Sequence, residues 1–211
     1  PIAIDRVRFV GEPVAVIVAR DRYVAEDALE RIEVEYETLR SETDPAAAAA
    51  PDAFVIHDSL KRNIVHRKTF RFGDPEGAFS RADRVVTIEV DYPRIMSTPL
   101  ETYGVVADYA LGDDRYTIWS NFQGPFIGHS IIAGALRTPT SRVRMISAPS
   151  SGGSFGVKWG VFSYAILIAL AARKAGTPVK WIEDRAEHLA ASSSSTSRRS
   201  YIEGAFSASG R

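Results

Sequence analysis

Residues 142–170 read RVRMISAPSSGGSFGVKWGVFSYAILIAL, and this stretch sets the organisation of the fold. Residues 143–147 alternate like a half-buried strand, residues 149–156 are rich in glycine, serine and proline, and an apolar segment long enough for a helix starts near Lys158. Glycines cost backbone entropy, so such a cluster is typical of a turn that needs positive φ or a close approach to the backbone. The stretch predicts strand, turn and helix, with the turn as candidate ligand site.

The glycine turn is compatible with more than one kind of site. Free N–H groups ahead of a helix form a seat for an anion such as a phosphate. A Walker A loop is excluded because Gly156 is followed by Val157, and the glycine spacing does not fit G-x-G-x-x-G. Residues 152–156 match the nucleophile elbow G-x-S-x-G, but Ser154 lies well beyond the strand end, and the only later Asp and His it could use are Asp184 and His188. A turn that only lets the helix pack closely stays open as an alternative.

The composition is that of an ordinary globular protein, with 211 residues, 45% hydrophobic and 25% charged. Lys plus Arg and Asp plus Glu both number 26, so no net charge steers the chain to nucleic acid or an anionic membrane. The absence of cysteine excludes disulfides and cysteine-ligated metals, and it fits a reducing compartment, so we expect a cytoplasmic protein. The longest apolar run, 161–172, is too short to span a bilayer. The chain starts at Pro1, and we expect it to be a piece of a longer protein.

The remaining segments predict a mixture of helices and strands. Residues 5–37 predict a strand at 14–18, a helix from Asp21 to about Arg31 and a strand at 32–36, and the Pro- and Ala-rich segment 43–53 is interpreted as a linker. Further elements are expected as follows: a helix at 74–82, a strand at 84–92, a hairpin of 105–110 with 116–120, a helix at 126–137, a strand at 179–183, a short helix from Asp184 and a strand at 201–206.

Several motifs in order resemble one enzyme family. Residues 7–16 read VRFVGEPVAV, followed by AEDA at 25–28 and VEYE at 34–37. This order resembles the end of the α/β hammerhead domain in the xanthine dehydrogenase, aldehyde oxidase and carbon monoxide dehydrogenase family. Downstream, TPLE at 98–101, NFQGP at 121–125 and GGSFGVK at 152–158 are similar to that family's Pro-Met/Leu-Glu-Pro, Thr-Gln-x-Pro and Gly-Gly-Gly-Phe-Gly-x-Lys segments. The resemblance covers nearly all of the chain.

The resemblance implies an α+β fold in two domains. Residues 1–60 would be the C-terminal part of a hammerhead domain, a strand-helix-strand segment with a linker, and residues 61–211 the first part of a mixed-sheet molybdopterin-binding domain. The implied function is part of a molybdenum-cofactor oxidoreductase that hydroxylates an aldehyde, N-heterocycle or related small molecule with water as oxygen source. The cofactor would be molybdenum-molybdopterin, in the cytosine dinucleotide form if the source is bacterial. The implied partners are the rest of the large subunit and the subunits or domains that carry iron–sulfur clusters and FAD.

Family position also assigns cofactor-binding residues. Gln123 would donate its amide to a ligand oxygen on molybdenum, and Gly124 would bind the cofactor beside it. Gly153, Ser154, Phe155 and Gly156 would border the metal. A glutamine amide is neutral and both donates and accepts, which suits this role, although a buried amide satisfying a turn is the commoner use of such a residue. We expect Gln123 and Phe155 to approach one another at the mouth of a common cleft, because both strand-to-helix turns should end on the same side of the sheet.

No residue of this chain is assigned a catalytic or direct metal-ligating role. The glutamate that serves as base in the family lies beyond the equivalent of Arg211, so the 211 residues alone are expected to lack hydroxylase activity. A cluster of Glu183, Asp184, Glu187 and His188 offers possible metal ligands, but a solvated capping turn is expected.

Departures from the family pattern bear on the substrate. Purine oxidisers carry a glutamate where Trp159 stands, and the serines of 192–197 replace a cysteine of carbon monoxide dehydrogenases and an arginine of purine oxidisers. These changes favour a bulky or neutral aromatic or carbonyl substrate over a purine. The alternative function is a non-catalytic assembly module of the same fold without cofactor.

Overall fold

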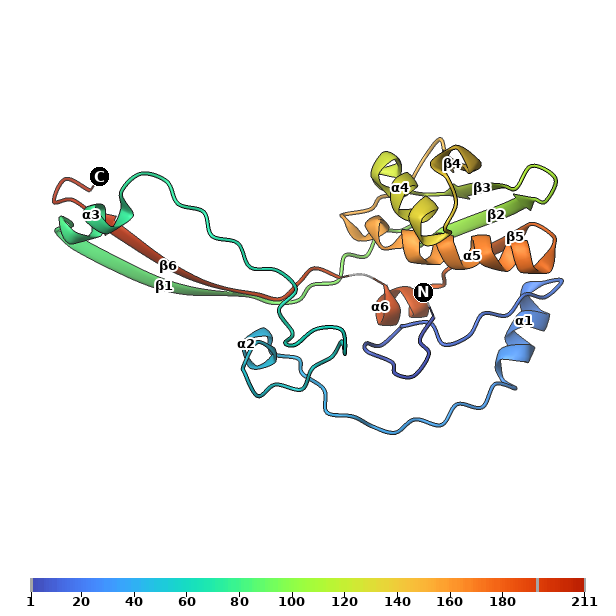
Figure 1. The fold of residues 1–211 in the computed structure, drawn as a ribbon, viewed down its shortest axis with the longest axis horizontal. Coiled ribbons are helices and arrows are strands. Elements are labelled where there is room, and N and C mark those ends of the chain that lie inside the picture. The colour runs from blue at the N-terminus through green and yellow to red at the C-terminus, as the bar shows by residue number, and fades with distance from the viewer. Residues whose placement is uncertain (1, 193, 211) are drawn as a thin grey trace. The chain divides into compact units, whose positions relative to one another are not determined.

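The computed structural model describes residues 2–192 and 194–210 and has the mixed α+β composition expected from the sequence (Figure 1). The chain divides into two compact units, Pro1–Glu35 with Met96–Ser195 and Tyr36–Ile95 with Thr196–Arg211. These units are defined by contacts within the chain, and each combines segments that are separate in sequence. The predicted division into a hammerhead domain and a molybdopterin-binding domain near residue 60 is a different division and stays a prediction.

The first unit contains a mixed sheet of four strands in the order β4-β3-β2-β5. Its strands are β2 (Gly104–Ala110), β3 (Arg115–Ser120), β4 (Val143–Ser147) and β5 (Val179–Ile182). The predicted hairpin is confirmed, since β2 and β3 are antiparallel with Val105 opposite Ser120. β5 is antiparallel to β2, whereas β4 is parallel to β3. The parallel pair places the chain segments that follow β3 and β4 at the same edge of the sheet.

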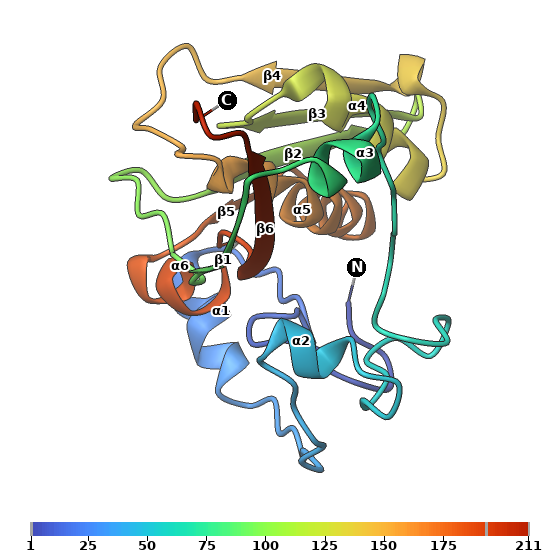
Figure 2. The same ribbon diagram turned by 90° about the vertical axis from the view of Figure 1, so that its left-hand side faces the viewer.

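Helices α4 (Pro125–Ala135) and α5 (Val161–Ala175) pack against one face of this sheet, as Figures 1 and 2 show. Alternate residues of β2 and β3, such as Val105 and Ile118, are buried, and α5 buries an apolar stripe against them. Each large side chain buried in this way stabilises the fold by about 1.5–3 kcal/mol. α5 begins after the 3-10 turn η2 (Val157–Trp159), slightly later than predicted. No helix in the described part of the chain is long and apolar enough to cross a bilayer.

Helix α1 (Arg22–Leu29) forms as predicted, because the Asp21 side chain accepts a hydrogen bond from the Val24 N–H at 2.9 Å. The strands predicted on either side of it, at 14–18 and 32–36, are wrong for the described structure, in which both segments lie outside any sheet ladder. Alternating apolar residues give a segment the tendency to be a strand, but a strand forms only where a neighbour pairs its N–H and C=O groups.

The second unit is built on a two-stranded antiparallel ribbon of β1 (Arg84–Tyr92) and β6 (Arg198–Phe206), with Arg84 opposite Phe206. β1 and α3 (Pro75–Ser80) lie where the sequence predicted them, and β6 begins earlier than expected. The segment interpreted as a linker contains a turn of helix, α2 (Pro45–Ala48). Its first residue is proline, which suits that position, and Asp44 caps it by accepting from the Ala46 N–H at 2.7 Å.

Candidate functional site

The glycine turn after β4 starts beside the turn that follows β3. Ser120 and Ser147, the last residues of these parallel strands, lie opposite one another, and the Ala148 N–H donates to the Ser120 carbonyl at 3.3 Å. Each turn then leads into a helix on the same face of the sheet. The expected convergence of the two turns is therefore present.

Ser154 and Gln123 connect these turns directly. The Ser154 hydroxyl donates a hydrogen bond to Gln123 Oε1, and the Lys158 backbone N–H donates to Ser154 Oγ at 3.2 Å. Gln123 Nε2 has no hydrogen-bond partner within residues 2–192 and 194–210. Phe155, the next residue, has 78% of its surface exposed. Whether Gln123 and Phe155 share the mouth of a cleft stays a prediction.

The backbone of the glycine turn is held in an unusual conformation. Gly153 and Gly156 have φ of 93° and 94°, and Phe155 has φ of 51°, which is uncommon for a residue with a side chain. A Cβ at Gly156 would meet nothing within 4 Å, so the backbone there is open to an approaching group. A Cβ at Gly152 would instead lie 2.5 Å from the Glu101 Cβ. The turn thus packs tightly on one side and leaves its other side free.

Residues 97–102, called the 97–102 segment below, contact the tightly packed side of the glycine turn. The Ser97 hydroxyl donates to the Phe155 carbonyl at 3.3 Å. Helix α6 (Arg185–Ala191) fixes the segment from behind, because Arg185 Nη2 donates to the carbonyls of Pro99 at 2.7 Å and Leu100 at 2.8 Å. The segment therefore ties α6 to the glycine turn.

Glu101 and Lys158 form an ion pair beside the glycine turn. The Glu101 carboxylate pairs with the Lys158 ammonium and accepts from the Gly152 N–H at 3.0 Å and the Ser151 hydroxyl at 3.1 Å. Burial alone would raise the pKa of the Glu101 carboxyl, but hydrogen bonds from Lys158, Asn121 and Gly152 outweigh it and lower this pKa to about 2. Glu101 is thus a carboxylate that holds the turn in place and is not available as a base.

The possible metal cluster near α6 separates into two structural pairs. Asp184 and Glu187 form a capping box at the start of the helix, as the capping-turn prediction required. Glu183 and His188 are buried, with His188 Nδ1 2.8 Å from Glu183 Oε2 and Nε2 3.2 Å from the Ser97 carbonyl. No group of three potential metal ligands occurs among the described residues. Because the His188 nitrogens face Glu183 and Ser97, the ring is not the base that a Ser154 nucleophile would need.

Trp159 packs against the first of the two turns. A Cβ on Gly124 would lie 2.8 Å from the Trp159 ring, and this ring meets Phe162 edge-on with 5.6 Å between centroids. The Trp159 side chain therefore shapes the entry to α4, and 39% of its surface remains exposed. Of the serines at 192–197, Ser193 lies outside the described residues.

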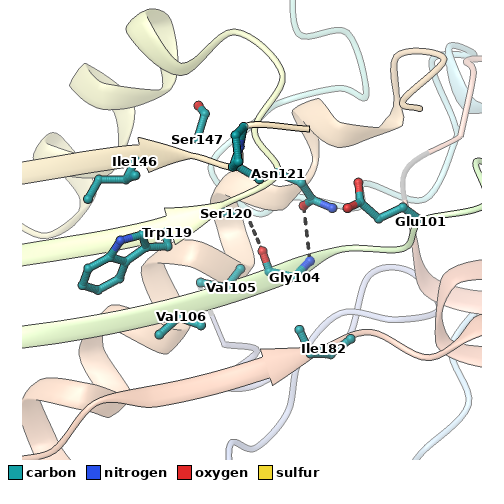
Figure 3. Close-up of a pocket in the computed structure, with 12 residues that line it drawn as sticks. Glu101, Gly104, Val105, Val106, Trp119, Ser120, Asn121, Ile146, Ser147 and Ile182 are labelled. Atoms are coloured by element: carbon teal, nitrogen blue, oxygen red, sulfur yellow. Dashed lines mark hydrogen bonds between the residues drawn. The ribbon is translucent and has the colours of Figure 1, made fainter. Parts of the chain in front are cut away.

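A cavity of about 320 Å³ lies on the sheet at the ends of β2, β3 and β4, and it is distinct from the predicted cofactor residues. Figure 3 shows Glu101 and Asn121 at one end and Trp119 and Val106 at the other. Asn121 Oδ1 accepts from the Gly104 N–H at 3.3 Å, which fixes the polar end. Gln123, Gly124 and residues 153–156 do not line this cavity, which is joined to the glycine turn through Glu101.

Comparison with known families shows which family the chain belongs to. The family model described as "Molybdopterin cofactor-binding domain" matches residues 56–211. The chain belongs to this family. A second model, "Aldehyde oxidase and xanthine dehydrogenase, a/b hammerhead domain", matches residues 1–40. The resemblance found in the sequence motifs is thereby confirmed, and the chain corresponds to part of a molybdenum hydroxylase large subunit.

Individual members of the molybdenum hydroxylases give the same picture. The chain is 36% identical over 205 residues to the carbon monoxide dehydrogenase large chain of Afipia carboxidovorans (91% of this chain, 25% of that protein). It is 38% identical over 210 residues to the nicotine 6-hydroxylase large subunit of Paenarthrobacter nicotinovorans (100% and 26%). The crystal structure of quinoline 2-oxidoreductase from Pseudomonas putida 86 superimposes with a TM-score of 0.85 at 33% identity (98% and 26%). The chain therefore spans about a quarter of the length of these relatives.

Sequence reasoning missed two features of the site. The first is the buried pair Glu183–His188, and the second is the pair of the buried Lys158 with the partly exposed Glu101; these residues were interpreted as surface or motif positions. Two sequence signals pointed to Lys158: it is the lysine of the family loop segment, and a cation is unusual between a glycine turn and an apolar helix.

Proposed function

We propose that this chain forms one side of the molybdopterin site of a molybdenum hydroxylase, with Gln123, Gly124 and residues 153–156 facing the cofactor. The observation that carries the proposal is the hydrogen bond that joins Ser154 to Gln123 across two turns from adjacent parallel strands. It brings the open glycine backbone and a free amide NH2 group to the same place. When bound, the cofactor would supply the oxidative hydroxylation of a small molecule with water as the oxygen source.

The donor set of the site fits this group. Gln123 Nε2 lacks a protein partner in the described structure, and the backbone at Gly156 has open space on the side that a Cβ would fill. Amide and backbone N–H groups are neutral donors, so they can bind oxygen-rich ligands without adding charge. The 97–102 segment holds the turn from the opposite side, which keeps these donors in place before a ligand arrives.

The substrate class we propose is a neutral aromatic or carbonyl compound. Trp159 presents an aromatic surface next to Gly124 and cannot make the charge-assisted contacts of a glutamate. Relatives of this chain are named for carbon monoxide, nicotine, quinoline and xanthine, so the proposal rests on Trp159 and not on these names. The non-catalytic assembly module is not favoured, because these relatives are named as dehydrogenases, hydroxylases and oxidoreductases.

The cofactor variant and the partners are part of the same proposal. We propose the cytosine dinucleotide form of molybdopterin, and iron–sulfur and FAD partners that accept the electrons. Relatives named "large chain" and "large subunit" support the presence of further subunits.

Metal and pterin analysis of the full-length protein, purified from a host that makes the cofactor, tests the proposal. We expect equimolar molybdenum and pterin in the wild type. A Gly156→Val variant should lose both, because a β-branched side chain disfavours φ of 94° and would fill the open side of the turn. A Gly134→Ala variant should retain both, since nothing lies within 4 Å of that position. A folded wild-type protein without molybdenum would support the assembly module instead.

A further inference from the structure

Ser154 occupies the place where the two turns of the site meet. Its Oγ accepts from the Lys158 backbone N–H at 3.2 Å and donates to Gln123 Oε1. Lys158 is itself fixed, because its side chain is 1% exposed and pairs with Glu101. Ser154 therefore accepts a hydrogen bond from the Lys158 backbone on one side and contacts the Gln123 amide on the other.

The two hydrogen bonds of Ser154 determine which end of the Gln123 amide faces the serine. A serine hydroxyl carries one proton, and the Lys158 N–H already uses the oxygen as an acceptor. If the Gln123 amide were reversed, its NH2 group would also donate to the hydroxyl. The hydroxyl proton would then have no acceptor within the described part of the chain. The arrangement that satisfies every group has Gln123 Oε1 facing Ser154.

This orientation also fixes where the Gln123 NH2 group points. With Oε1 engaged by Ser154, the Gln123 NH2 group points away from the serine and has no partner among residues 2–192 and 194–210. Gln123 is half-buried, so water does not surround the amide as it would on an open surface. A donor left free in this position is suited to an acceptor on a bound ligand.

We propose that Ser154 is a positioning residue that sets the orientation of the Gln123 amide, so that its NH2 group and not its carbonyl faces the cofactor. The identity of the acceptor rests on the proposed function, whereas the orientation itself rests on the hydrogen bonds of this chain. Alanine or glycine at position 154 would leave Gln123 Oε1 without its donor and allow the amide to turn. Threonine would retain the hydroxyl.

The test uses the full-length holoenzyme with Ser154→Ala, Ser154→Thr and the matched control Ser163→Ala. Ser163 is exposed on α5, where its hydroxyl donates to the Gly160 carbonyl at 2.9 Å. Molybdenum content is measured first. The main readout is the coupling of solvent-exchangeable protons to the EPR signal of partly reduced molybdenum, compared in H2O and D2O, together with kcat and KM.

We expect equal molybdenum content in all variants. Ser154→Ala should lose the exchangeable-proton coupling of the Gln123 amide and lower kcat roughly fivefold, the effect of one hydrogen bond, with KM little changed. Ser154→Thr and Ser163→Ala should retain the wild-type coupling. Gln123→Glu should also remove it, because a carboxylate has no NH2 group. If Ser154→Ala does not accumulate, Ser154→Gly takes its place.

Two results would overturn the inference, and they are distinguishable. A molybdenum-containing Ser154→Ala enzyme with the wild-type proton coupling would show that the serine does not orient the amide, while the proposed function stands. A wild-type protein that holds no molybdenum would overturn the proposed function, and the inference with it.

Discussion

The Lys158 side chain is 1% exposed, whereas its ion-pair partner Glu101 keeps 38% of its side chain exposed. The two charges therefore depend on one another to different extents. Glu101 can return to water if the pair is broken, but Lys158 cannot. The buried Lys158 ammonium therefore requires the counter-charge that Glu101 of the 97–102 segment supplies.

The first prediction compares the two halves of this pair. Glu101→Gln should lower the free energy of unfolding by about 3 kcal/mol, because it leaves the buried Lys158 ammonium without a counter-charge. Lys158→Met should cost only about 1 kcal/mol, since Glu101 can be hydrated and methionine fills the same space. Urea titrations of the two variants measure the difference. Equal losses would show that the burial asymmetry has no energetic consequence.

The second prediction concerns acid stability. The Glu101 pKa is lowered from 4.5 to about 2 in the folded protein, with the hydrogen bonds from Lys158, Asn121 and Gly152 outweighing the effect of burial. A carboxyl with a lowered folded-state pKa stabilises the fold fully above its unfolded pKa, and this contribution is lost as the pH falls from 4.5 toward 2. Unfolding measured across this range should be less pH-dependent in Lys158→Met than in wild type. A Lys158→Met protein with the wild-type pH slope would contradict the assignment.

The third prediction is that Gly152→Ala displaces the glycine turn. The new Cβ would lie 2.5 Å from the Glu101 Cβ and 3.3 Å from its backbone N, and both belong to the well-held 97–102 segment. We expect a loss of stability of about 1–3 kcal/mol from overpacking. Gly134→Ala in α4 is the control, because that position is open and alanine favours helix. The prediction fails if both substitutions give the same melting temperature.

The fourth prediction concerns the buried pair behind the turn. His188→Phe should destabilise the protein by about 3 kcal/mol, since it leaves the buried Glu183 carboxylate without the imidazole 2.8 Å away. His188→Gln keeps a donor group and should cost less. His66→Gln, at an exposed position, should have no measurable effect on thermal unfolding. A His188→Phe protein as stable as His66→Gln would mean that the pair contributes nothing to the fold.

The elements that the sequence predicted well carry local signals. The hairpin of β2 and β3 has a Gly-Asp-Asp turn between alternating strands, and α5 has a continuous apolar stripe that ends at Gly176. The strands expected at 14–18 and 32–36 failed because pairing depends on a neighbour that local pattern does not identify. The alanines of the linker could form a turn of helix, but Pro45 and Pro51 bracket them and favoured a linker; α2 forms because Pro45 fits the first helical position and Asp44 caps it.

The candidate site divides in the same way. The glycine turn and the Gln123 turn were visible as local breaks between strand and helix, and the parallel pairing of β3 and β4 brings them together. The Glu101–Lys158 pair joins residues 57 positions apart, and a lysine is rarely fully buried, so the sequence did not predict this pairing. Ser154 stands where the family segment has a glycine, but only the side-chain geometry shows that it contacts Gln123.

A crystal structure of the full-length protein with its cofactor would test the assignment of the glycine turn to the molybdopterin site. We expect Gln123 Nε2 and the backbone N–H groups of residues 153–156 to lie within hydrogen-bond distance of the molybdenum-molybdopterin group, with Ser154 Oγ still bonded to Gln123 Oε1. A cofactor bound elsewhere, with the glycine turn facing solvent or protein, would contradict it.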